Sequence, residues 1–269
     1  MTGLAGLPMY DFGRLAAAND ALWQAIAARL TAAGLGAVPA QLDRSLPIDR
    51  LWQDPRLLLA QTCGYPLMTS LLGRVRLVAT PRYRAFGCDG SAHGSALVVH
   101  ARDYTSDLAG LRGRRCAANQ RHSNTGMNLL RATVADFADG KPFFRSVAWT
   151  GSHRASLAMV AAGEADLAAI DAVTLAQLGR LEPQLASQVR ILGWTEVTPG
   201  LPLITSAETD DATVEILRTA LLEIASAPDY AALRDELLLD GFDLVPEPAY
   251  RSILVLEQRA TDLGYPHLH

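Results

Sequence analysis

Apolar and polar residues alternate along the chain in blocks whose spacing predicts strands and helices in turn. Over residues 14–33 apolar side chains such as Leu15 and Leu22 recur at helical spacing, and Gly34 ends the run. From residue 95 the alternation is regular, which predicts a mostly parallel sheet with flanking helices. In this part we expect strands at 95–100, 115–118, 144–149, 167–170 and 189–192, and helices at 125–138, 153–162 and 173–181.

The flanking segments extend this α/β pattern into two lobes. Before residue 95 we expect strands at 4–10, 35–42, 57–61 and 75–81, helices at 14–33, 47–53 and 67–72, and a loop at 82–94. A turn and short strand at 198–205 precede helices at 211–225, 230–238 and 249–263. Residues 1–94 plus 196–269 are predicted to form the first lobe and residues 95–195 the second, with a hinge where the chain crosses between them.

Composition excludes several classes of protein. The chain has 269 residues, 49% hydrophobic, with a net charge of −4, which is typical of a folded protein and unlike a nucleic-acid binder. No run of 18 apolar residues predicts a membrane span. The three cysteines, Cys63, Cys88 and Cys116, are widely spaced, which argues against a disulfide framework and a zinc site. We expect no metal and no cofactor.

The N-terminal sequence leaves the location of the protein open. Its first residues, MTGLAGLPMYDFGR, lack the basic segment and apolar core of a secretory signal. Either the protein is cytoplasmic, or it is periplasmic and its leader is missing from this numbering.

The segment Asn119–Arg131 is the strongest candidate for a binding site. It follows the expected strand 115–118 and places Ser123, Asn124, Thr125 and Gly126 where a helix starts. Such a start offers N–H groups and a partial positive charge to an anion. Ser, Asn and Thr are also good helix caps, so an ordinary cap is the alternative interpretation.

Other polar segments follow expected strands, and ligands of parallel sheets bind beyond the carboxyl ends of the strands. These segments are Met9–Asp11, Gln61–Pro66, Ser123–Gly126, Thr150–Arg154 and Asp171. Because they come from both lobes, we expect a cleft between the lobes to bring them together.

At this point the sequence resembles a known family. The segments LPMYD, DALW, LAQTCGYPL, SNTGMNLLR, TGSHRASLAMVAAGEADLAAID and TPGLP are similar to phosphate/phosphonate-type substrate-binding proteins of ABC transporters. The resemblance implies the type II periplasmic-binding-protein fold: two lobes joined by a hinge, which close over a small oxyanion such as phosphate, phosphite or a phosphonate. It implies ligand binding rather than catalysis, a monomer, and an ABC permease as partner.

The resemblance also implies ligand-binding residues. The anion site of the family falls on Ser123, Asn124 and Thr125, and Tyr65 matches a tyrosine that closes over the ligand, with Tyr10 lining the same cleft. Alternatively, Tyr65 packs in a turn beside Pro66.

Two further residues match pocket positions of the family. His153 matches a pocket histidine, and Asp171 matches an acid that accepts a proton from a monoprotonated oxyanion or binds an ammonium group. Alternatively, His153 bonds locally at its helix start and Asp171 caps the following helix.

Two alternative functions remain open. A cytoplasmic small-molecule sensor could share the fold, and a thiol hydrolase could use Cys63 and His153, oriented by Asp171.

Because the usual Ser/Thr-rich loop reads Ser-Asn-Thr here, phosphate, phosphonate and an unrelated small anion all remain possible ligands.

Overall fold

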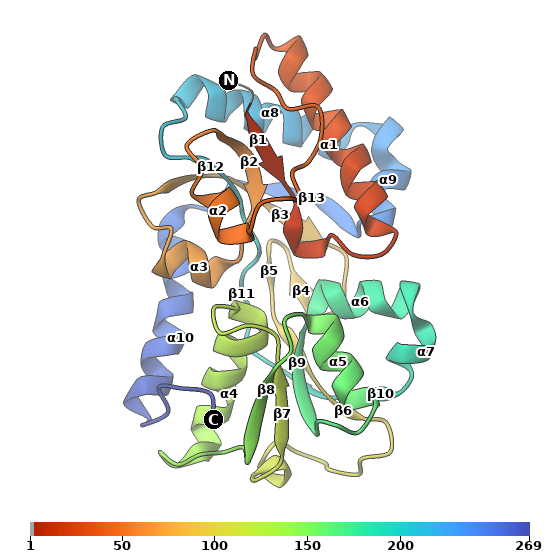
Figure 1. Cartoon of the computed structure of the whole chain (residues 1–269), viewed down its shortest axis with the longest axis vertical. Helices are drawn as coiled ribbons and strands as arrows, with labels where there is room; N and C mark the ends of the chain where they lie inside the picture. Colours follow the sequence, from red (N-terminus) through yellow and green to blue (C-terminus); the bar gives the residue numbers. More distant parts are fainter. Residues whose placement is uncertain (1–2) are drawn as a thin grey trace. The chain divides into compact units, whose positions relative to one another are not determined.

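The computed structural model describes residues 3–269, which divide into two compact units (Figure 1). Unit 1 comprises the residues up to Arg84 together with Pro199–Ala249. Unit 2 comprises Ala85–Thr198 and Tyr250–His269. The two-unit α/β architecture agrees with the fold predicted from sequence. The chain passes from one unit to the other near residues 84, 198 and 249, whereas the sequence predicted boundaries near residues 94 and 195.

Unit 1 is built on a five-stranded sheet with the strand order β1-β2-β12-β3-β13. Its strands are β1 (Leu4–Gly6), β2 (Leu57–Gln61), β3 (Val75–Tyr83), β12 (Leu203–Ser206) and β13 (Leu239–Asp243). Its helices are α1 (Leu15–Ala32), α2 (Ile48–Trp52), α3 (Gly64–Thr69), α8 (Asp211–Ser226) and α9 (Ala231–Glu236), with 3-10 turns at Pro8–Tyr10, Pro228–Tyr230 and Glu247–Tyr250. The fully buried Trp23 of α1 anchors this helix in the core of the unit.

Unit 2 is built on a second five-stranded sheet, with the order β10-β6-β9-β7-β8. Its strands are β6 (Ser95–His100), β7 (Arg115–Ala118), β8 (Ser146–Trp149), β9 (Leu167–Asp171) and β10 (Val189–Trp194). Its helices are α4 (Leu129–Ala138), α5 (His153–Ala161), α6 (Ala172–Leu181), α7 (Pro183–Ala186) and α10 (Arg251–Asp262), with a 3-10 turn at Ala109–Leu111 and a π-helical turn, η3, at Asn124–Asn128. The short strands β4 (Cys88–Asp89), β5 (Ala92–His93) and β11 (Thr198–Pro199) form a third sheet.

Both large sheets are mixed, although the sequence pattern predicts mostly parallel ones. In unit 2, β7 pairs in parallel with β8 and β9, whereas β6 runs antiparallel to β9 and β10. In unit 1, β12 is antiparallel to β2 and β3. Parallel neighbours in a sheet are usually joined by a crossover helix. β12 and β6 are instead each reached after the chain has passed from one unit to the other, so no such helix sets their direction.

Three segments differ from the sequence prediction for physical reasons. Residues 35–42 were expected to form a strand, but side chains of α1 hold this segment instead, since Trp23 Nε1 donates to Pro39 O (3.0 Å) and Gln24 Nε2 to Ala40 O (2.7 Å). The expected loop 82–94 contains the β4–β5 hairpin. β13 lies between the helices expected at 230–238 and 249–263, where no strand was predicted, and it pairs with β3.

The closing helix α10 belongs to unit 2, whereas the sequence-based division assigned it to the first lobe. It packs along α4, and Leu256 shares a buried cluster with Leu129 and Ala132 (Figure 1). α10 therefore stabilises the helix that starts at the candidate anion site.

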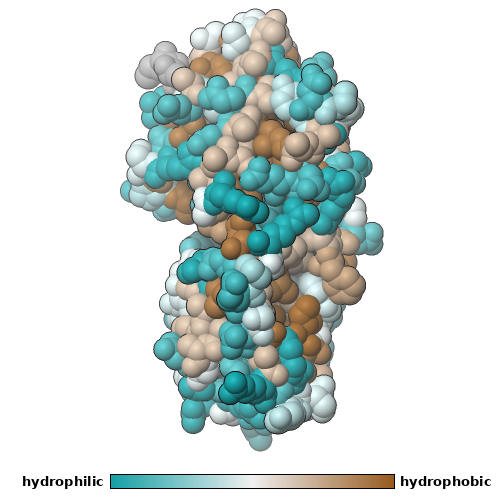
Figure 2. Space-filling view, turned by 90° about the vertical axis from the view of Figure 1, so that its right-hand side faces the viewer, coloured by the Kyte–Doolittle hydropathy of each residue, from teal (hydrophilic) through white to brown (hydrophobic). Residues whose placement is uncertain are grey.

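The surface is mixed in character. On the face drawn in Figure 2, hydrophilic and hydrophobic residues are interspersed over both units. Within residues 3–269, no helix combines the length and the apolarity needed to span a membrane.

Candidate functional site

The helix that follows β7 begins where the sequence predicts it. Ser123 is its N-cap, and the Ser123 hydroxyl oxygen accepts the N–H of Gly126 at 3.0 Å. The first turn is π-helical, because Asn128 N donates to Ser123 O (3.1 Å), five residues back. A helix start has N–H groups that its own backbone cannot satisfy, so this turn can cradle an anion. Ser123, Asn124 and Thr125 are all buried.

A network of buried polar side chains supports this turn from within unit 2. Asn124 Nδ2 donates to Thr198 Oγ1 (2.8 Å), and Asn124 Oδ1 accepts from Asn128 Nδ2 (3.1 Å). Asn128 in turn accepts from the buried Arg131 at 2.6 Å, and Arg131 pairs with Glu257 of α10 at 3.3 Å. The Asn124 side chain therefore holds the turn in place.

His153, the first residue of α5, contacts the same turn. Its Nε2 lies 3.1 Å from Thr125 Oγ1, and its Nδ1 lies 3.2 Å from Ala169 O. Burial of the ring lowers the pKa of His153, and the nearby charge of Asp171 only partly opposes this effect. The imidazole is therefore neutral at pH 7 and can orient the Thr125 hydroxyl.

Asp171 is buried near His153, and each of its carboxylate oxygens lies close to a partner. Oδ1 accepts the N–H of Thr174 (2.9 Å) as the N-cap of α6, and Oδ2 pairs with His93 Nε2 at 2.9 Å. Burial alone would raise the pKa of the Asp171 carboxyl, but the charge and hydrogen bond of His93 outweigh burial and hold it well below its usual value. Asp171 thus carries a fixed negative charge and fulfils the capping role considered from sequence.

Asn119 and Gly126 belong to this constellation, although the sequence reasoning did not select Asn119. A Cβ on Gly126 would lie 2.0 Å from Asn119 Oδ1 and 2.9 Å from His153 Cε1, so any larger residue here would displace these side chains. Asn119 Oδ1 is buried and lacks a hydrogen-bond partner among residues 3–269. An unsatisfied acceptor of this kind costs about 1–3 kcal/mol. The position of Asn119 directly after a strand was the available sequence signal.

The two tyrosines selected from sequence lie in unit 1. Tyr10 is buried, and its ring packs edge-on against Tyr83 with 5.3 Å between centroids. The Tyr83 hydroxyl accepts from Gln61 Nε2 at 3.1 Å. Tyr65 is half-buried on α3, where its carbonyl accepts the Thr69 hydroxyl at 2.8 Å.

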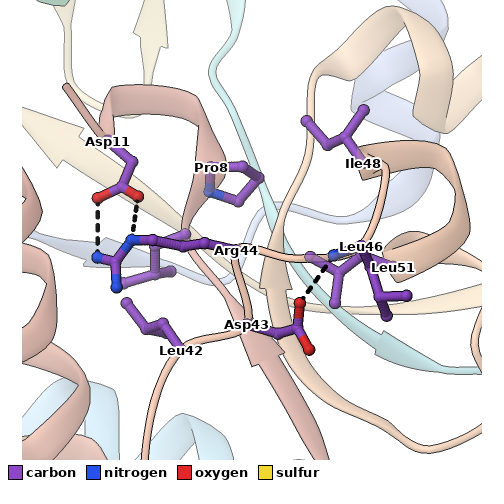
Figure 3. Close-up of a pocket in the computed structure, with 9 residues that line it drawn as sticks. Pro8, Asp11, Leu42, Asp43, Arg44, Leu46, Ile48 and Leu51 are labelled. Carbon is purple, nitrogen blue, oxygen red and sulfur yellow. Dashed lines mark hydrogen bonds and ion pairs between the residues drawn. The ribbon is translucent and has the colours of Figure 1, made fainter.

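A hollow of about 200 Å³ in unit 1 is lined by a different set of residues, which includes Pro8, Asp11, Asp43 and Arg44 (Figure 3). Arg44 binds Asp11 through two nitrogens, at 2.6 and 3.1 Å, as the dashed lines show. Asp43 accepts the N–H groups of Ser45 and Leu46. Because its carboxylates repel anions and its charges are already paired, this hollow does not suit an oxyanion.

A second hollow, of about 500 Å³, lies in unit 2 beside β8. It is wide and includes Arg121, whose guanidinium stacks over the Trp149 ring at 4.4 Å. Arg154, the last residue of the polar segment Thr150–Arg154, makes two 2.6 Å hydrogen bonds to Glu182.

The pair required by the thiol-hydrolase alternative is divided between the units. Cys63 is buried in unit 1, and His153 belongs to unit 2, where it faces Thr125. Within residues 3–269, no cluster of three or more His, Cys, Asp or Glu side chains could hold a metal ion.

Comparison with known proteins identifies the family of the chain. Residues 57–250 match the model of a family described as the periplasmic substrate-binding protein of phosphonate ABC transporters. No curated protein is significantly similar to the chain in sequence.

Solved structures share the fold at low sequence identity. A binding protein component of an ABC phosphonate transporter from Pseudomonas aeruginosa is 15% identical, with a TM-score of 0.77, over 97% of this chain and 87% of that one. PhnD1 from Prochlorococcus marinus, in complex with methylphosphonate, is 14% identical, with a TM-score of 0.76, over 97% and 98%. XAC2383 from Xanthomonas citri, bound to ATP, is 16% identical, with a TM-score of 0.69, over 98% of both chains.

Proposed function

Because the chain belongs to the family of periplasmic substrate-binding proteins of phosphonate ABC transporters, we propose that it binds a small phosphonate. The single observation that carries this proposal is the helix start Ser123–Gly126, hereafter the oxyanion cradle, in which Ser123 caps the turn and His153 orients Thr125. The methylphosphonate bound by PhnD1 and the ATP bound by the X. citri protein both carry phosphorus oxyanions, which supports the same ligand chemistry here.

Each residue of the cradle has a proposed role. The phosphonate oxygens accept hydrogen bonds from the hydroxyls of Ser123 and Thr125 and from the backbone N–H groups of Asn124 and Thr125. Such charge-assisted hydrogen bonds are short and strong. His153 positions the Thr125 hydroxyl, and Asp171 holds His93 and α6 in place behind it. In unit 1, we retain Tyr65 and Tyr10 as proposed ligand contacts on the family resemblance alone.

The family suggests how the bound ligand is used. We propose that the protein acts as a monomeric, non-catalytic carrier that delivers its ligand to an ABC permease from the periplasm. The sensor and thiol-hydrolase alternatives are not favoured.

A thermal-shift series tests the proposed ligand class. The protein is refolded to strip any carried ligand and then heated with methylphosphonate, aminoalkylphosphonates, phosphate, phosphite, sulfate, ATP, nitrate or carboxylates. A ligand at 100 times its Kd adds about 2.7 kcal/mol of stability, or about 5–10 °C for a chain of this size. A shift with a phosphonate is expected, and no shift with any phosphorus compound would refute the proposal.

Two variants locate the binding site within the fold. Ser123→Ala removes a helix cap and a proposed ligand donor, whereas Asp210→Ala removes only the cap of α8, where Asp210 accepts Thr213 N at 2.7 Å. Each variant should be somewhat less stable than the wild type, because each lacks one N-cap hydrogen bond. Only Ser123→Ala should also lose affinity for methylphosphonate, by at least about tenfold. Equal affinities in the two variants would place the ligand elsewhere.

A further inference from the structure

The outer edge of the unit 2 sheet has no neighbouring strand. β8 is the last strand of this sheet, and within the described residues it pairs with β7 alone (Figure 1). A strand in a parallel pair bonds to its neighbour through alternate residues. Because Arg145 N donates to Arg114 O at 2.8 Å, the N–H groups of Ser146 and Ala148 point away from β7. This edge can therefore accept one more strand.

The hollow of about 500 Å³ in unit 2 follows this edge. Its lining includes Arg145, Val147 and Trp149, together with Arg121 and residues 267–269. Side chains two residues apart in a strand lie on the same face, so Arg145, Val147 and Trp149 share one face of β8. At about 3.3 Å per residue, the distance along the strand from Arg145 to Trp149 is about 13 Å. An extended segment of about five residues has this length.

The hollow is positively charged at both ends. Arg145 lies at one end, and at the other the Arg121 guanidinium stacks over the Trp149 ring at 4.4 Å. Both arginines are exposed, and within residues 3–269 neither side chain forms an ion pair, whereas Arg154 pairs with Glu182. No aspartate or glutamate of the described chain lines the hollow. Its charge therefore attracts a partner that carries negative charges at two separated positions.

The second wall of the hollow is held in place by backbone hydrogen bonds. His269 O accepts the N–H groups of Phe143 and Phe144, at 3.0 and 3.1 Å, just before β8. Leu268 is buried, which fixes the same segment from the inside. The hollow is therefore formed before a partner arrives, and binding does not require this wall to become ordered.

We propose that β8 is a docking edge for an extended acidic segment of a partner protein, which adds to the sheet as a further strand. On the face that meets the hollow, its alternate residues are acidic, apolar and acidic. The two carboxylates face Arg145 and Arg121, and the apolar side chain faces Val147. Opposite charges across paired strands stabilise the pairing, whereas like charges destabilise it.

A second copy of this chain does not have the required charges. If two β8 strands paired with each other in antiparallel orientation, Arg145 of each copy would lie near Arg121 of the other, and these like charges repel. The edge also lies apart from the oxyanion cradle, since none of the residues Ser123–Gly126 lines the hollow. The proposal therefore does not depend on phosphonate binding.

Fluorescence anisotropy with a labelled pentapeptide tests the docking edge. The probe is Glu-Thr-Val-Thr-Glu, whose charge pattern is the same in both directions, so that it fits parallel or antiparallel pairing. Gln-Thr-Val-Thr-Gln is the neutral control of the same shape. At low ionic strength we expect saturable binding of the acidic peptide and at least about tenfold weaker binding of the neutral one. Equal affinities, or no binding of the acidic peptide at about 1 mM, would overturn the proposal.

Charge-reversal variants locate the peptide on the protein. Arg121→Glu and Arg145→Glu should each weaken binding of the acidic peptide at least about fivefold. Arg50→Glu, at an exposed position of α2 in unit 1, changes the net charge equally and should bind within about twofold of wild type. The double variant of Arg121 and Arg145 should instead prefer Lys-Thr-Val-Thr-Lys. Equal losses in all three single variants would show an unspecific charge effect and overturn the proposal.

Amide spectra show whether the bound peptide forms a strand. The N–H groups of Ser146 and Ala148 should shift downfield and exchange more slowly when the acidic peptide is added, because each gains a hydrogen bond. Binding that leaves both amides unchanged would overturn strand addition. A concentration-dependent dimer in sedimentation, abolished by Arg145→Glu, would assign the edge to a second copy and would overturn the proposal as well.

Discussion

Removing the carboxylate of Asp171 should destabilise unit 2 far more than neutralising it. Asp171→Ala removes the N-cap of α6, worth about 1 kcal/mol. It also leaves the buried His93 without its partner, at a cost of about 1–3 kcal/mol. Together these losses lower the free energy of unfolding by about 3 kcal/mol, or the melting temperature by about 6–12 °C.

Asp171→Asn is the matched control for this prediction. Asparagine caps helices as well as aspartate does and still offers an oxygen to His93 Nε2. Only the charge of the hydrogen bond is lost, which accounts for about 1 kcal/mol. The prediction therefore requires Asp171→Ala to be less stable than Asp171→Asn by about 2 kcal/mol.

Urea unfolding at pH 7, followed by circular dichroism, measures both variants. The slope of free energy against urea should stay constant, so that the midpoint alone reports stability. If Asp171→Ala lies within about 1 kcal/mol of the wild type, or the two variants are equally unstable, the His93–Asp171 pair does not support the fold as described.

Three further predictions concern the cradle and its neighbours. Gly126→Ala should displace Asn119 and lower the affinity for methylphosphonate at least about tenfold. Gly179→Ala in α6, where a Cβ meets open space, should leave the affinity unchanged. Equal affinities of the two variants in a calorimetric titration would contradict this prediction. Burial lowers the pKa of His153, so below about pH 6.5 the unfolded chain binds a proton that the folded chain does not, and the free energy of unfolding should fall as the pH drops. His153→Gln should lose less stability over this pH range than the wild type, and parallel curves of stability against pH for the two proteins would contradict the prediction. Cys63→Ala should bind methylphosphonate within about twofold of wild type, and a larger loss in a folded variant would reopen a role for the thiol.

The sequence pattern predicted those elements whose signals are local. β2, β6 and β7 have the bounds expected from short apolar runs between polar residues. The helix start at Ser123 was expected from cap chemistry, and the Ser123 hydroxyl does accept the Gly126 N–H. Local chemistry was sufficient in both cases because burial and capping depend on a few adjacent residues.

Elements that depend on distant partners could not be predicted in this way. β13 contains Asp240 and Gly241, which weaken its strand signal, and it exists because it pairs with β3. His93 lies in a two-residue strand inside an expected loop, and its partner Asp171 is distant in sequence. No sequence spacing reveals that pair, or the unsatisfied oxygen of Asn119, because both result from tertiary packing.

Amide chemical shifts during a methylphosphonate titration test the central claim most directly. If the oxyanion cradle binds the ligand, the backbone amides of Asn124 and Thr125 should shift downfield and saturate at one ligand per chain, as N–H groups that donate to an anion do. Saturable binding that leaves both amides unchanged would contradict the account, because the ligand would then bind somewhere other than the start of this helix.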